Sequence, residues 1–262
     1  MKSKTTKRKN RNPLSYRKRN YRSIMASEGL TSSHVTIRET DLFILADKDV
    51  SAEAAHLVLA YRGQLENYIS RHPKFLVSLI PLEMDSLAPP IVKAMLSAGT
   101  QAGVGPMAAV AGALAEFVGK DLLKATSNEI IVENGGDIFM YRRHESHVAI
   151  FAGTSLLSNK IGIKIPANAM PLGICTSSGT IGHSLSFGQA DAVTVLAPST
   201  ALADAAATRL GNELKKKSDM DRTLKIAQTL PDLRGVVIVK DDQLGVWGEI
   251  ELIPLERDKT FT

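Results

Sequence analysis

The sequence predicts an α+β fold in which antiparallel sheets are covered by long helices. The main observation is a pattern of one helix followed by a two-stranded hairpin, which occurs twice. The elements expected in the two copies are a helix at 103–123 with strands at 129–133 and 137–141, and a helix at 199–214 with strands at 235–240 and 244–252. A second observation is that further strand-like segments lie between the copies, at 147–152, 160–165 and 191–197. The duplication, over about 100–150 and 199–252, predicts a pseudo-repeat within one domain at 21–255.

The elements before the first copy follow from local signals. Alternating apolar residues at 34–38 and an apolar run at 42–45, joined by a Glu-Thr-Asp turn, predict a hairpin. Apolar residues at helical spacing predict a helix over 51–70, with Ser51 as its N-cap. Four prolines then indicate an irregular stretch, and a short helix is expected at 91–98.

The positive charge of the chain is confined to one end. The 262 residues carry 32 Lys and Arg against 27 Asp and Glu, a net charge of +5. Ten of the basic residues and none of the acids lie in 1–22, so residues 23–262 carry a formal −5. Residues 1–20 are therefore expected to be a disordered basic tail, and 256–262 a short C-terminal tail. RNA association through the basic tail is a hypothesis, but nucleic-acid binding by the body is not expected.

Cysteine content and the length of apolar runs bear on the cellular compartment of the protein. The single cysteine, Cys175, excludes an intrachain disulfide and suits a reducing cytoplasm. The longest apolar run, 104–115, has about a dozen residues, whereas a membrane-spanning helix needs ~20. We therefore expect a cytoplasmic protein without a membrane partner.

The segment 173–184 could bind an anion. Its glycines let backbone N–H groups approach a phosphate, and the hydroxyl groups of Thr176, Ser177, Ser178 and Thr180 add donors. The alternative is a Gly/Ser loop that only turns the chain. His183, which follows, is either a catalytic acid or base or a structural hydrogen-bonding residue.

Asp204 and Thr208 form a candidate cation site. They are four residues apart in an alanine-rich helix, so their oxygens project from one helix face. Magnesium takes oxygen ligands and often only one or two from protein. The alternative is that Asp204 interacts only with the partial positive charge at a helix N-terminus.

Two glycine-containing segments complete the candidates. Glu133-Asn134-Gly135-Gly136-Asp137 contains an Asn-Gly hairpin signal, and its acids could also line a site. The glycines of 103–107 lead into a helix of small residues, where Gly105 and Gly112 alternatively serve close helix contacts. Neither segment has the spacing of a Walker loop or a dinucleotide-binding fingerprint.

Together these motifs resemble the ApbE family of magnesium-dependent flavin transferases. The order is Glu-Asn-Gly-Gly-Asp at 133–137, Cys-Thr-Ser-Ser-Gly-Thr at 175–180, and Ala-Asp-Ala-Ala-Ala-Thr at 203–208. The match is closer to an uncharacterised branch of that superfamily, and it covers roughly 20–255. The resemblance implies a duplicated, tunnelling-type α+β fold that binds FAD between its halves.

The resemblance also implies roles for individual residues. Asp204 and Thr208 correspond to the magnesium ligands of the transferases. The flavin-nucleotide site corresponds to Gly135, Gly136, Asp137, Thr176, Ser177, Ser178 and Gly179, with Thr180 beside them.

The sequence also departs from the transferases. It has Gly105-Pro106-Met107-Ala108 where they have Lys-Gly-Tyr, and 184–188 reads Ser-Leu-Ser-Phe-Gly where they have Asp-Pro-Arg-Thr-Gly. The lost Asp and Arg would handle charge in phosphoryl transfer. Two hypotheses follow: a magnesium-assisted enzyme that transfers or hydrolyses a flavin or other pyrophosphate-containing cofactor, with His183 as acid or base, or a non-catalytic module that binds a cofactor or partner. A homo-oligomer is compatible with both.

Overall fold

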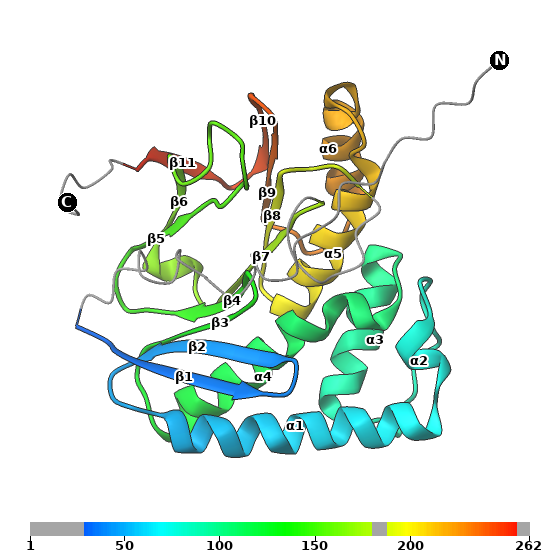
Figure 1. Cartoon of the computed structure of the whole chain (residues 1–262), viewed down its shortest axis with the longest axis vertical. Coiled ribbons are helices and arrows are strands. Elements are labelled where there is room, and N and C mark those ends of the chain that lie inside the picture. Colours follow the sequence, from blue (N-terminus) through cyan, green and yellow to red (C-terminus); the bar gives the residue numbers. More distant parts are fainter. Residues whose placement is uncertain (1–28, 180–187, 256–262) are drawn as a thin grey trace.

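The chain folds into two antiparallel sheets and a layer of helices (Figure 1). The computed structural model describes residues 29–179 and 188–255, so both predicted tails lie outside the described residues. The helices are α1 (Ser51–Arg71), α2 (Lys74–Val77), α3 (Pro90–Ala102), α4 (Val110–Ala125), α5 (Thr200–Glu213) and α6 (Met220–Thr229). The strands are β1 (Thr31–Ile37), β2 (Thr40–Ala46), β3 (Ile130–Asn134), β4 (Asp137–Tyr141), β5 (Ser146–Ala149), β6 (Ile161–Ile165), β7 (Leu172–Ser177), β8 (Ala192–Ala197), β9 (Gly235–Lys240), β10 (Gln243–Gly248) and β11 (Glu251–Pro254).

The larger sheet has eight strands in the order β1-β2-β3-β4-β7-β8-β9-β10, and every pair is antiparallel. The helices cover one of its faces, and the three-stranded sheet β11-β6-β5 covers the other (Figure 1). Side chains therefore alternate between two cores along each strand. In β7, Leu172 and Ile174 enter the core between the sheets, whereas Cys175 enters the core under the helices.

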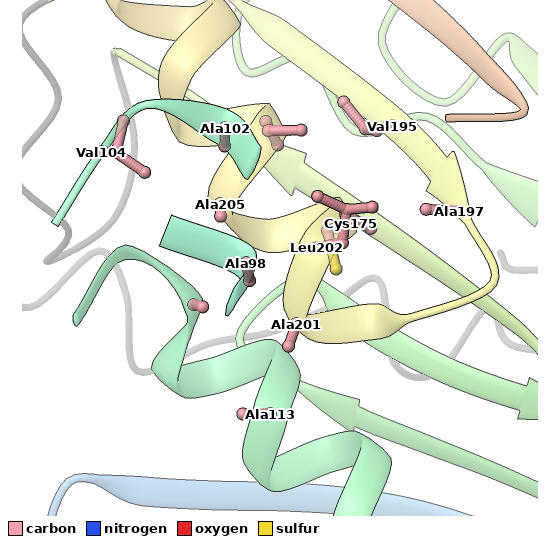
Figure 2. Packing of buried hydrophobic residues seen from close by; sticks show 14 of the residues in the cluster. Ala98, Ala102, Val104, Ala113, Cys175, Val195, Ala197, Ala201, Leu202 and Ala205 are labelled. Atoms are coloured by element: carbon pink, nitrogen blue, oxygen red, sulfur yellow. The ribbon is translucent and has the colours of Figure 1, made fainter. Parts of the chain in front are cut away.

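Small side chains let the helices lie close to one another and to the sheet. Figure 2 shows Ala98 of α3, Ala113 of α4 and Ala201 of α5 gathered near Cys175 of β7. A Cβ atom on Gly173 of β7 would lie 2.4 Å from the Cα of Thr200. The N-terminus of α5 therefore rests directly on this strand.

The three hairpins expected from the sequence are present, as β1–β2, β3–β4 and β9–β10. The strands β1 and β2 pair as predicted, although the turn lies at Arg38-Glu39, one residue earlier than the Glu-Thr-Asp turn. The strands β3 and β4 are joined by Gly135 and Gly136, which both have positive φ. Only glycine adopts this conformation readily at both positions of so tight a turn.

Several predicted boundaries were wrong. The helix expected at 103–123 begins at Val110, because Gly103 ends α3 in the left-handed conformation and Pro106 starts a short 3-10 helix at Pro106–Ala109. The strand expected at 244–252 divides at Gly248 into β10 and β11, which belong to different sheets. The helix α6 was not predicted. The pseudo-repeat of the two helix–hairpin units stays a prediction.

The N-cap of α1 also differs from the prediction. Asp49, and not Ser51, accepts the free N–H at this helix start, with 2.9 Å between its Oδ1 and the Ser51 nitrogen. Asp49 Oδ1 also accepts the Ser33 hydroxyl at 2.8 Å, so the cap is linked to β1. The pKa of Asp49 is lowered by these bonds, above all by that from the Ser51 hydroxyl.

Within 29–179 and 188–255, no single helix is long and apolar enough to cross a membrane. The segments Pro90–Ala102 and Pro106–Ala125 reach that length only together, and they are bent by 106° at the break between them.

Candidate functional site

The candidate site begins at the β3–β4 turn, where it meets the end of β7. The N–H of Thr176 donates to the carbonyl of Gly136 at 3.2 Å, and Asp137 lies opposite Cys175 in the strand pairing. Asp137 and Cys175 both point toward the helices, because they share a face with Phe139 and Val195, which lie in the cores under the helices. The predicted turn and the start of the Gly/Ser segment are therefore brought together.

Asp204 reaches the same region from α5. Its Oδ2 accepts the N–H of Gly112 at 2.9 Å, in the first turn of α4. The alternative prediction was that Asp204 interacts with a helix N-terminus. It does so, but the N-terminus is that of α4 and not that of its own helix α5. A carboxylate has about four acceptor sites, so Asp204 can accept further bonds beside this one.

Burial disturbs the ionisation of both aspartates. Removal from water raises the pKa of Asp204 to about 7, although the N–H groups of Gly112 and Ala111 act in the opposite direction. Burial also raises the pKa of Asp137 well above 3.8, and the charges of Asp204 and Glu133 raise it further. Two neighbouring carboxylates that resist ionisation favour either a shared proton or a bound cation.

Cys175 lies between the two aspartates and the start of α5. Its sulfur is 3.4 Å from the carbonyl oxygen of Thr200, and it is also hydrogen-bonded to Asp137. Burial, followed by the charges of Asp137 and Asp204, raises the pKa of this thiol well above 9.0. A raised thiol pKa favours the protonated form, which donates a hydrogen bond, over the nucleophilic thiolate.

Thr176 and Ser177 point in opposite directions from β7. The Thr176 hydroxyl is 2.9 Å from that of Thr194, on the face toward the smaller sheet. Ser177 points toward α5, where its Oγ would lie 3.3 Å from a Cβ atom on Gly211. Of these two predicted ligand-binding residues, only Ser177 shares the face of Asp204.

The predicted loop at 173–184 is partly a strand. Residues Leu172–Ser177 form β7, so the Gly/Ser composition did not indicate a loop there. The N–H of Gly179 donates to the Ala190 carbonyl at 2.9 Å, and that of Thr176 is bound by Gly136. These two N–H groups are therefore engaged within the fold and are not anion donors. Ser178 follows β7 directly, whereas Thr180 and His183 lie outside the described residues.

Glu116 is a residue of this region that the sequence did not single out. It lies on α4, and its Oε2 accepts the Ser199 hydroxyl at 3.0 Å and the N–H groups of Thr200 and Ala201 at 2.7 and 3.1 Å. Glu116 thus caps α5 while Asp204 of α5 caps α4. The reciprocal caps hold Asp204 in a fixed position relative to the sheet.

The close contact between α4 and α5 depends on Gly112. A Cβ atom there would lie 2.4 Å from the Thr200 carbonyl oxygen and 2.8 Å from the Asp204 Cβ. We expect Gly112→Ala to lower the free energy of unfolding by about 1–3 kcal/mol, measured by urea unfolding.

Gly63 supplies the matched control for Gly112→Ala. It lies in the middle of α1, and a Cβ atom there would meet no atom within 4 Å. We expect Gly63→Ala to stabilise by about 0.5–1 kcal/mol through helix propensity. Equal effects of the two substitutions would contradict the close-contact argument.

The site residues suit a hard cation. Asp204 and Asp137 offer oxygen ligands of raised proton affinity, and Thr208 lies one turn after Asp204 on α5 and is partly buried. No group of three or more His, Cys, Asp or Glu side chains is arranged for a metal in the described parts of the chain. A cation here would therefore take most of its ligands from a phosphate or water, as magnesium commonly does.

Comparison with known proteins gives consistent matches. A family model described as "AbpE bacteria" matches residues 22–239. A UPF0280 protein of Methanocaldococcus jannaschii is 39% identical over 235 residues, which are 87% of this chain and 94% of the relative. A UPF0280 protein of Methanococcus maripaludis is 42% identical over 233 residues, with the same coverage of 87% and 94%.

Solved structures show the fold. The apo flavinyl transferase ApbE of Pseudomonas stutzeri matches with a TM-score of 0.53 over 83% of this chain and 94% of that chain, at 13% identity. An identity this low establishes the fold alone. The α+β, ApbE-like fold expected from the sequence is confirmed.

Proposed function

Because the chain belongs to the family described as AbpE bacteria, together with the UPF0280 proteins, we propose that it binds a flavin nucleotide such as FAD with the help of magnesium. The observation that carries the proposal is a pair of carboxylates on the helix side of the sheet beside the end of β7: Asp137, which is buried, and Asp204, which is partly buried and whose charge acts on Asp137. A flavin is proposed as the ligand because the fold neighbour from Pseudomonas stutzeri is a flavinyl transferase.

The proposed roles follow from position. Asp204 and Thr208 would hold the cation, and Asp137 would add negative charge beside it. When bound, magnesium would neutralise the pyrophosphate and draw electron density from its phosphorus–oxygen bonds. Gly135, Gly136, Ser177, Ser178 and Gly179 lie in segments that border this region and would contact the nucleotide, together with Thr180, whereas Thr176 faces the smaller sheet and is not assigned this role.

Overall charge supports a cation in this role. Residues 23–262 carry a formal −5, and three acidic side chains, Glu133, Asp137 and Asp204, lie at this end of the sheet. A pyrophosphate would be repelled by these groups unless a cation offset their charge.

The test is a titration of purified protein with FAD, in magnesium and in chelator. We expect wild-type protein to bind FAD at least about tenfold more tightly with magnesium. Asp204→Asn should bind FAD equally under both conditions, because it keeps the shape of the side chain but loses its charge. The exposed Asp221 on α6 gives the control, since Asp221→Asn should keep the magnesium dependence. Equal wild-type binding in both conditions would refute the metal role.

Transfer or hydrolysis of the cofactor is the second candidate function. The residues at 184–188 lack the Asp and Arg of the transferase loop, and this absence favours cofactor binding without catalysis over transfer. A turnover assay with FAD and a flavinylation-target peptide distinguishes transfer from binding alone. A covalently flavinylated peptide would establish transfer, and a His183→Ala variant would then test the proposed acid or base.

A further inference from the structure

The chain between α1 and α3 exposes an apolar surface. In Figure 1, α2 and the chain that follows it lie at the right-hand edge of the molecule, outside α3. Six large apolar side chains in this segment are at least half exposed. They are Leu76, Val77, Leu79, Ile80, Met84 and Leu87, and we call them the 76–87 face.

The backbone beneath the 76–87 face is held by specific contacts. A Cβ atom on Gly105 would lie 1.8 Å from the Ser78 carbonyl oxygen, so the segment is packed tightly against the start of the 3-10 helix. The Ser78 hydroxyl donates to the Ile80 carbonyl at 2.7 Å. Asp85 accepts the Tyr68 hydroxyl at 3.1 Å and the Leu87 N–H at 2.9 Å. The exposed side chains are therefore presented by an ordered scaffold.

The 76–87 face exposes more apolar area than single, scattered apolar side chains do on a protein surface. Six such side chains in twelve residues expose several hundred square ångströms of apolar surface, which on a monomer marks an interaction site. A groove of about 430 Å³ adjoins them, between residues 81–84 and α3. Met84 lines one wall, and Ser97 and Thr100 line the other.

We propose that the 76–87 face is the contact surface between two copies of this chain. A two-fold dimer buries the same patch on both subunits, so the several hundred square ångströms of apolar surface on each subunit form a large part of the roughly 800 Å² per partner of a stable interface. The groove would receive apolar side chains such as Leu87, which is 92% exposed.

Two exposed charges of opposite sign accompany the 76–87 face and agree with two-fold pairing. Lys74 comes two residues before the face and Glu83 lies within it, and neither takes part in an ion pair among the described residues. A two-fold axis between them places each Lys74 toward the partner subunit's Glu83. The pairing needs no cofactor and is independent of the proposed function.

The test is sedimentation equilibrium of the full chain over a concentration series. We expect wild-type protein to be a dimer. We expect Ile80→Asp and Leu87→Asp each to weaken dimerisation by about 100-fold or more, because every substitution places two charges in the apolar contact. Both side chains are exposed, at 70% and 92%, so far-UV circular dichroism should show unchanged folding.

Leu156→Asp is the matched control. Leu156 is 73% exposed but lies outside the 76–87 face, so this variant should dimerise like wild type. A wild-type protein that is monomeric up to about 100 μM would overturn the proposal. Binding of a different protein to the 76–87 face would not rescue it. A dimer that survives both face substitutions, or one that Leu156→Asp also dissociates, would overturn it as well.

Discussion

Glu116→Ala is expected to lower the free energy of unfolding by about 3–5 kcal/mol, the cost of leaving buried charge-assisted partners unsatisfied. The substitution removes the acceptor of the Ser199 hydroxyl and of the Thr200 and Ala201 N–H groups at the buried start of α5. Water cannot replace the carboxylate readily, because Thr200 is fully buried and Ala201 is too. Chemical unfolding in urea measures the loss.

Two further variants test the reason for that loss. Glu116→Gln keeps one acceptor oxygen and should recover part of the stability. Glu53→Ala removes an exposed glutamate from the first turn of α1 and should cost no more than about 1 kcal/mol. If Glu116→Ala were no more harmful than Glu53→Ala, the capping of α5 by Glu116 would be refuted.

Asp204→Asn is expected to stabilise the metal-free protein at alkaline pH while it removes magnesium binding. The pKa of Asp204 is about 7 in the folded protein, against an ordinary value of 3.8. Between these values the folded state holds a proton that the unfolded chain has lost. The contribution of Asp204 to the free energy of unfolding is therefore complete below about pH 4, and it is lost progressively as the pH rises to 7.

The expected magnitude follows from the same shift. At about pH 8 in chelator, Asp204→Asn should be more stable than wild type by an amount on the order of 1–4 kcal/mol, and near pH 4 the difference should vanish. Urea unfolding at both pH values measures this. Magnesium should stabilise wild type and leave the variant unchanged. A variant that is less stable than wild type at pH 8 would show that Asp204 serves only as a cap.

Local signals predicted the parts of the fold that depend on neighbouring residues. The Asn-Gly-Gly turn and the β1–β2 hairpin were found because turn chemistry and alternation act within a few residues. The strand β7 was missed because its helix face carries Gly173 and Cys175, which are small to let α5 approach. The composition of β7 therefore resembles that of a loop, and only the contact with α5 explains why these residues are small.

The site was predictable in its residue types but not in its geometry. The motifs placed Asp137 and Asp204 among the candidates, and the topology brings them to one face. Sequence could not show that Thr176 points to the opposite face, because that depends on the register of β7 against β8. Nor could it show Glu116, whose role exists only where α4 and α5 touch.

The reciprocal caps have a consequence for cooperativity. Each of α4 and α5 receives an N-terminal acceptor from the other helix, and the two capping bonds join residues 84 and 92 positions apart in the chain. Ser199 caps α5 locally by accepting the Leu202 N–H, but the N–H groups of Thr200 and Ala201 depend on Glu116 of the other unit. The two units are expected to unfold as one, so that dividing the chain between them would leave two incomplete halves and not two small domains.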